Sequence, residues 1–145
     1  MADVNILFAC TTLATDEIYE ALFKDIDVDV YQDSPDLIWM DDLSSLVSHN
    51  DPDAIKSGIL GDSENLEVVF SFRGSMKGYI NSMKIVLNWL KLTDADTVLA
   101  HNYEYILFSR IGGSLVRNSH PVAAIPSEVL DIIDIPYEKE DLGFA

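Results

Sequence analysis

The sequence contains one cysteine, only nine basic residues and no long apolar run. Cys10 has no second cysteine to pair with, which excludes the disulfide framework of small secreted domains. The apolar stretch 4–10 is too short for a membrane span, and it follows Asp3 rather than the basic segment of a signal peptide. We therefore expect a cytoplasmic protein that makes no contact with a membrane.

The composition indicates a folded globular protein. The chain has 145 residues, of which 48% are hydrophobic and 10% aromatic. That length suits one domain with its own core, and it is too short for two domains of ordinary size. No repeat or linker interrupts the sequence, so we predict a single domain over residues 1–145.

The net charge of −16 is distributed unevenly along the chain. Residues 1–67 carry 16 acidic side chains against Lys24 and Lys56, a net charge of −14. Residues 68–126 carry a net charge of +3, and residues 127–145 carry −5. Such a charge repels nucleic acids and anionic membranes and attracts basic proteins. An acidic surface also keeps a protein soluble, so charge alone does not establish a partner.

The first half of the chain predicts strand, helix and strand. Residues 4–11 form a short apolar run that is typical of a buried strand, and a helix is expected to follow from Thr15. Residues 26–30 then alternate apolar and acidic side chains, the period of a strand with one buried face. Residues 32–64 keep no single period, so we expect a long connection with one or two short helices.

The second half shows the clearest periodicity. Residues 66–72 alternate as a strand, and an apolar stripe at helical spacing continues to about Leu92. Because the two elements are neighbours in sequence, we predict that their apolar faces pack together. The residues concerned are Leu66, Val68, Phe70, Phe72, Met83, Leu87 and Leu90.

A meander of strands is expected after this helix. Residues 97–101 and 104–110 are rich in β-branched and aromatic residues, and Asn102-Tyr103 between them predicts a two-residue hairpin turn. Gly112-Gly113 predicts a second turn, and we expect residues 137–145 to form a loose acidic tail. The order of elements predicts an α+β, two-layer sandwich: a largely antiparallel sheet with two main helices on one face, in a ferredoxin-like arrangement.

No metal or cofactor site is expected. Asp25, Asp27 and Asp29 have the spacing that opens a calcium-binding loop, and Asp36 occupies its twelfth position. The sixth position is Val30, where the loop needs glycine, and the aspartates fall within a strand-like alternation.

Catalytic motifs are also missing from the sequence. The three histidines are scattered, the glycines form no phosphate-binding loop, and Cys10 is expected to be an inert residue of a buried strand. We therefore predict a protein that is not an enzyme, although carboxylates brought together by the fold would escape this search. Six bases between residues 73 and 117 form a basic centre, but nucleic acid would have to approach it through the field of the acidic residues.

Residues 66–118 resemble the Sit-type immunity family of bacterial polymorphic and contact-dependent toxin systems. The residues that carry the resemblance are Ser71-Phe72-Arg73, the helix around Met83, Ala95-Asp96-Thr97-Val98-Leu99, Glu104, Arg110, Gly113-Ser114-Leu115 and Asn118. The resemblance implies a small protein that protects a bacterium against a cognate toxin. It identifies no residue that contacts the toxin.

Charge and resemblance together predict an immunity protein that neutralises a toxin with a basic surface. The expected contact residues are the carboxylates of the predicted second strand and the connection after it: Asp27, Asp29, Asp33, Asp36, Asp41 and Asp42. A non-catalytic adaptor or regulatory subunit of a larger complex is the alternative. The sequence leaves the oligomeric state open.

Overall fold

The computed structural model describes the chain in eight segments. They comprise residues 4–24, 26, 31–32, 37–40, 43–49, 65–72, 75–102 and 104–143. Their strands are β1 (Val4–Ala9), β2 (Tyr31–Gln32), β3 (Leu37–Met40), β4 (Leu43–His49), β5 (Leu66–Ser71), β6 (Thr97–His101), β7 (Tyr105–Ile111), β8 (Ser114–Asn118) and β9 (Glu138–Glu140). Their helices are α1 (Thr15–Phe23), α2 (Met76–Leu92), the 3-10 turn η2 (Pro121–Ala123) and α3 (Ser127–Leu130).

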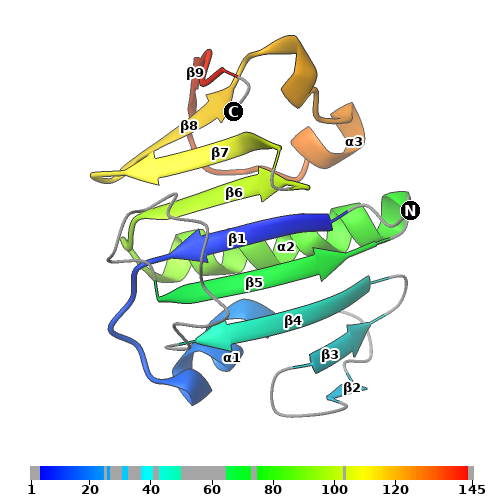
Figure 1. The fold of residues 1–145 in the computed structure, drawn as a ribbon, viewed down its shortest axis with the longest axis vertical. Coiled ribbons are helices and arrows are strands. Elements are labelled where there is room, and N and C mark those ends of the chain that lie inside the picture. The colour runs from blue at the N-terminus through cyan, green and yellow to red at the C-terminus, as the bar shows by residue number, and fades with distance from the viewer. Residues whose placement is uncertain are drawn as a thin grey trace.

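These strands form one nine-stranded sheet in the order β2-β3-β4-β5-β1-β6-β7-β8-β9 (Figure 1). Every neighbouring pair from β2 to β8 is antiparallel, and only β8 and β9 run parallel. The predicted α+β class with a largely antiparallel sheet is confirmed.

The centre of the sheet has the predicted ferredoxin-like arrangement. Its elements follow one another as β1, α1, β4, β5, α2 and β6, and the four strands lie side by side in the order β4-β5-β1-β6. The hairpin β2-β3 extends this unit at one edge, and β7, β8 and β9 extend it at the other. The first strand of the chain therefore lies between β5 and β6, which come much later in sequence.

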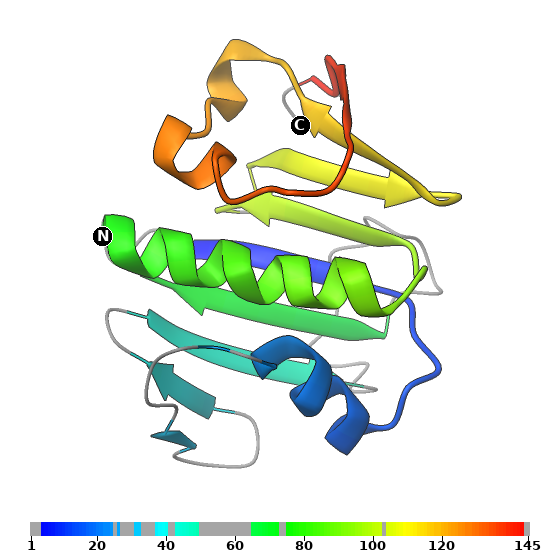
Figure 2. The same cartoon turned by 180° about the vertical axis from the view of Figure 1, so that it is seen from behind.

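Both main helices cover the same face of the sheet (Figure 2). The side-chain amide of Asn88 in α2 donates to the carbonyl oxygens of Leu22 and Lys24, at 3.0 and 2.7 Å, and so ties the end of α1 to α2. The hydroxyl of Ser75 caps α2 by accepting a bond from the amide of Gly78.

The main core lies between the helices and this face. The predicted packing is confirmed for all but one of its residues, because Leu66, Val68, Phe70 and Phe72 are buried in one cluster with Met83 and Leu90 of α2. Leu87 is buried but does not belong to that cluster. Trp89 lies in the same cluster and donates from Nε1 to the hydroxyl of Thr97 at 2.9 Å. A smaller cluster is formed by alternate residues of the central strands: Ile6, Phe8 and Ala100, with Val4 and Val69 packed against it.

The expected short helices between residues 32 and 64 are wrong for the part that is described, because β3 and β4 occupy it. In β4, Ser45 is fully buried, whereas Leu46 is 41% exposed. This inversion of polarity at two consecutive positions conceals the period of two that a strand normally shows. The strand expected at residues 26–30 falls, except for Ile26, outside the described residues.

The predicted meander is confirmed. Gly112 and Gly113 have φ values of 70° and 96°, and they connect β7 to β8 as a two-residue turn whose left-handed conformations favour glycine. Asn102 begins the turn between β6 and β7 with a φ of 51°, and the amide of Glu104 in this turn donates to the carbonyl oxygen of His101 at 2.9 Å. The two-residue turn expected at Asn102-Tyr103 is therefore wrong, because His101 pairs with Tyr105 and three residues lie between them.

The C-terminal segment differs from the loose tail expected for residues 137–145, because residues 138–140 pair with β8 as β9. Asn118 holds the chain that follows. Its side chain accepts bonds from the amides of His120 and Leu142 and donates to the carbonyl oxygens of Ile106 and Gly143. One buried amide thus uses all four of its hydrogen-bonding positions in this edge of the sheet.

Among the helices in the described segments, none has the length and apolarity needed to cross a bilayer.

Candidate functional site

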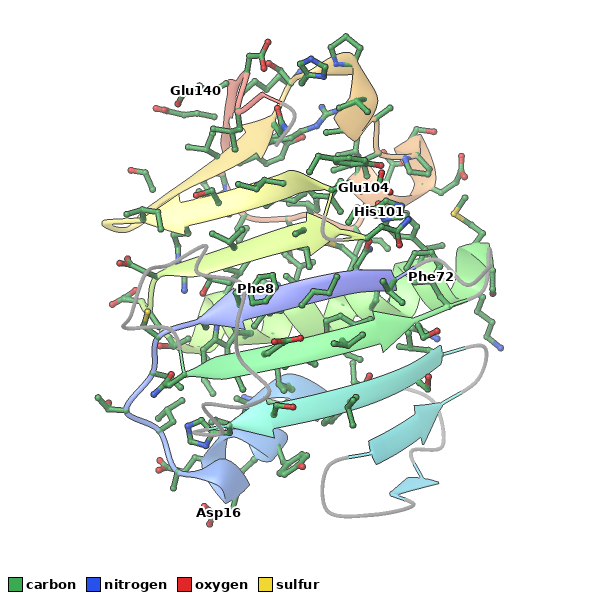
Figure 3. The ribbon with its side chains drawn as sticks, in the orientation of Figure 1. Phe8, Asp16, Phe72, His101, Glu104 and Glu140 are labelled. Carbon is green, nitrogen blue, oxygen red and sulfur yellow. The ribbon has the colours of Figure 1, made fainter. Side chains whose placement is uncertain are left out.

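The six aspartates expected to contact a toxin, Asp27, Asp29, Asp33, Asp36, Asp41 and Asp42, lie outside the described residues. The nearest described carboxylates in sequence are Asp16, Glu17 and Glu20 of α1, and all three are exposed. Figure 3 shows Asp16 at the outer end of this helix, directed away from the sheet. The described part of the acidic half therefore exposes three carboxylates on α1.

No group of three or more metal-binding side chains occurs within the segments that the structure describes. The aspartates that imitate a calcium loop fall outside those segments. The histidines are dispersed: His49 ends β4, His101 ends β6 and His120 precedes η2. His101 Nδ1 lies 2.7 Å from Asn5 Oδ1, and His120 Nδ1 accepts a bond from the Val122 amide.

The basic centre of the sequence separates into two environments. Lys77, Lys84 and Lys91 are exposed and follow one another at seven-residue intervals, so they form a stripe along α2. Lys91 pairs with Asp134 across 2.8 Å, and both side chains face solvent. Arg110, by contrast, is only 6% exposed, so it is not part of a surface patch for nucleic acid.

Arg110 joins β7 to the end of α2. Its Nη1 donates to the carbonyl oxygen of Leu90 at 2.6 Å, and Nη2 donates to those of Thr93 and Ala95 at 2.6 and 3.0 Å. The carbonyls of Leu90 and Thr93 lie at the negative end of the helix dipole, where a cation is stabilised. Burial lowers the pKa of the guanidinium, and the negative charges of Asp94 and Asp96 act in the opposite direction.

A groove of about 460 Å³ opens beside this arginine. Its lining comes from the end of α2, from β7 and β8, and from the segment that crosses toward β9, and includes Leu90, Arg110, Leu115, Ile135, Tyr137 and Glu138. The ring of Tyr137 packs edge-on against Phe108, with 5.8 Å between the ring centroids. The groove therefore combines an apolar wall with one buried cation and one exposed carboxylate.

The pairing of β7 with its two neighbouring strands explains why Arg110 lies in this groove. Arg110 lies opposite Thr97 on β6 and Leu115 on β8, and it shares its face of the sheet with Phe108. The sequence could have indicated this position, because side chains alternate between the two faces of a strand and an arginine two residues after a buried phenylalanine points to the same side. The far wall, which residues 135–138 supply, has no comparable signal in the sequence.

A second hollow of about 530 Å³ lies where β1 ends. Cys10, Thr12, Asn65 and Asp94 contribute to its lining. Asn65 holds the loop by exchanging two hydrogen bonds with the backbone of Thr11. Cys10 follows β1 and is partly exposed, so its expected position within a buried strand is wrong.

Comparisons of the chain with protein-family models, with curated proteins and with solved structures find no match.

Proposed function

We propose that this protein is a non-enzymatic immunity protein that binds and neutralises a cognate bacterial toxin through an acidic face. The observation that carries the proposal is the concentration of negative charge: residues 1–67 hold 16 of the 25 acidic side chains and only two of the nine basic ones. Solubility requires no such concentration in one half of the chain.

The charge suits the inhibition of a protein that acts on nucleic acid. A toxin of that kind has a basic substrate cleft, and an acidic inhibitor approaches it with electrostatically accelerated association. The exposed carboxylates Asp16, Glu17 and Glu20 support an acidic surface in this half of the molecule. The resemblance of residues 66–118 to Sit-type immunity proteins supports the same class of function.

The experiment is co-expression with the product of the neighbouring gene. If that product is the toxin, it should arrest growth alone, and this protein should restore growth and co-purify with it in a stoichiometric complex. A neighbouring product that is harmless and does not bind would contradict the pairing, whereas stable binding to a harmless protein would favour an adaptor subunit.

Association kinetics then test the acidic face. The triple variant Asp27→Asn, Asp29→Asn, Asp33→Asn should slow association about tenfold at low salt and flatten its salt dependence. A matched control, Asp131→Asn, Glu140→Gln, Asp141→Asn, removes the same charge near the C-terminus. Equal slowing in both variants would assign the effect to net charge and would contradict a localised acidic face.

A further inference from the structure

The Arg110 groove contains a cation whose bonding is incomplete. A guanidinium offers five N–H donors, and three bonds from Arg110 are present, all to backbone carbonyl oxygens. Its Nε is buried without a hydrogen-bond partner, and Arg110 forms no ion pair with any described carboxylate. Buried charges are ordinarily paired, so the positive charge of this arginine, rather than its enclosed Nε, is the feature that attracts an anion to the groove.

The rest of the groove is suited to an apolar group. Leu90, Leu115 and Ile135 contribute aliphatic surface, and Pro136 and Tyr137 extend it along the crossing segment. A volume of about 460 Å³ lies within the range of small-molecule sites. Apolar walls with one convergent charged group are the usual composition of such sites.

We propose that this groove binds a small organic carboxylate with an apolar body, its carboxylate next to Arg110 and its apolar part against Leu90, Leu115 and Ile135. This site is separate from the acidic half of the chain and does not depend on the proposed immunity function.

The charges around the groove favour a ligand that carries only one negative charge. Asp94 and Asp96 already act on Arg110, Glu138 lines the groove, and the protein has a net charge of −16. A phosphate dianion or a polyanion would meet more repulsion than one guanidinium offsets. A monocarboxylate adds one charge, and its apolar part gains from burial in the groove.

Binding is tested with hexanoate, its neutral counterpart hexanamide, and acetate, which lacks the apolar body. Hexanoate at millimolar concentration should raise the melting temperature and shift the amide resonances of Gly113 and Leu115 in NMR spectra. Hexanamide and acetate should each bind at least about tenfold more weakly. Equal binding of hexanamide would overturn the role of Arg110, and equal binding of acetate would overturn the role of the apolar wall.

Variants locate the site. Arg110→Gln, which removes the positive charge, should abolish the selectivity for hexanoate over hexanamide, although it also disturbs the end of α2. Glu138→Gln avoids that difficulty because Glu138 is exposed, and it should tighten hexanoate binding about two- to fivefold by removing a like charge. Glu140→Gln on the same strand, outside the groove lining, is the matched control and should change affinity less. Shifts that map elsewhere, or equal effects of the two glutamate variants, would overturn the proposal.

Discussion

At the centre of the sheet, β1, β5 and β6 pack against α2 through apolar side chains, whereas at the C-terminal edge β9 buries no side chain and depends on polar contacts. Leu7, Phe70 and Trp89 are fully buried in the central cluster. All three residues of β9 are exposed, and the bonds of Asn118 hold the chain that surrounds them. Removing apolar volume should therefore unfold the whole protein, while removing one amide should release only an edge.

The largest effect is expected for Phe70→Ala. Phe70 is fully buried between β5 and the helices, and truncation of such a residue costs about 3–5 kcal/mol of unfolding free energy. Urea denaturation followed by circular dichroism measures this loss. Leu46→Ala, at an exposed position of the neighbouring strand, should cost less than about 1 kcal/mol. Similar losses for both variants would refute the central role of this cluster.

Asn118→Ala should have the next largest effect, about 2 kcal/mol, because it leaves partly buried backbone groups without partners. Hydrogen exchange should accelerate at the Leu142 amide and remain slow at β1 and β5. Lys139→Ala, an exposed change in β9, should leave exchange unaltered. If exchange accelerates equally throughout the sheet, the edge is not a separate unit.

Ser75→Ala should cost about 1 kcal/mol, the usual contribution of a helix N-cap. Ser127→Ala is the matched control, since Ser127 is the first residue of α3 and its hydroxyl bonds to Glu128 rather than to the helix backbone. Thermal denaturation of the two variants should show a lower melting temperature only for the first. Equal melting temperatures would contradict a stabilising cap at α2.

The smallest effect concerns the pair of Lys91 and Asp134. The hydrogen bond from Lys91 lowers the pKa of Asp134, so its stabilising contribution is present above the pKa of an unfolded aspartate and is lost as pH falls through the folded value. Because both side chains are exposed, solvent weakens this contribution. An NMR titration should show the Asp134 pKa rising in Lys91→Ala, and an unchanged value would exclude the pair in solution.

Local sequence signals predict the apolar centre of the sheet better than its polar C-terminal edge. The alternation of Leu66, Val68 and Phe70 and the stripe of α2 are local signals, and they were sufficient for β5, α2 and the packing between them. They did not predict β4, the second strand of the ferredoxin-like unit, which lies where short helices were expected. The pairing of β9 and the bonds of Asn118 join residues up to 25 positions apart, and no local pattern predicts them.

Of the two candidate sites, one was expected from the sequence and the other was found only in the structure. Charge asymmetry was visible in the sequence, but the aspartates chosen from it lie outside the described residues. The Arg110 groove was not predicted, since it depends on the end of α2, two strands and the crossing segment meeting at one place.

The position of β1 also has a consequence for synthesis on the ribosome. Both of its partners, β5 and β6, are translated later, so the strand is made first but can pair on both sides only after residue 101 has emerged. At typical elongation rates the 56 residues between β1 and β5 take on the order of seconds to translate. During that interval the apolar side chains of Ile6, Leu7 and Phe8 lack their partner strands, which makes the nascent β1 segment a natural binding segment for chaperones.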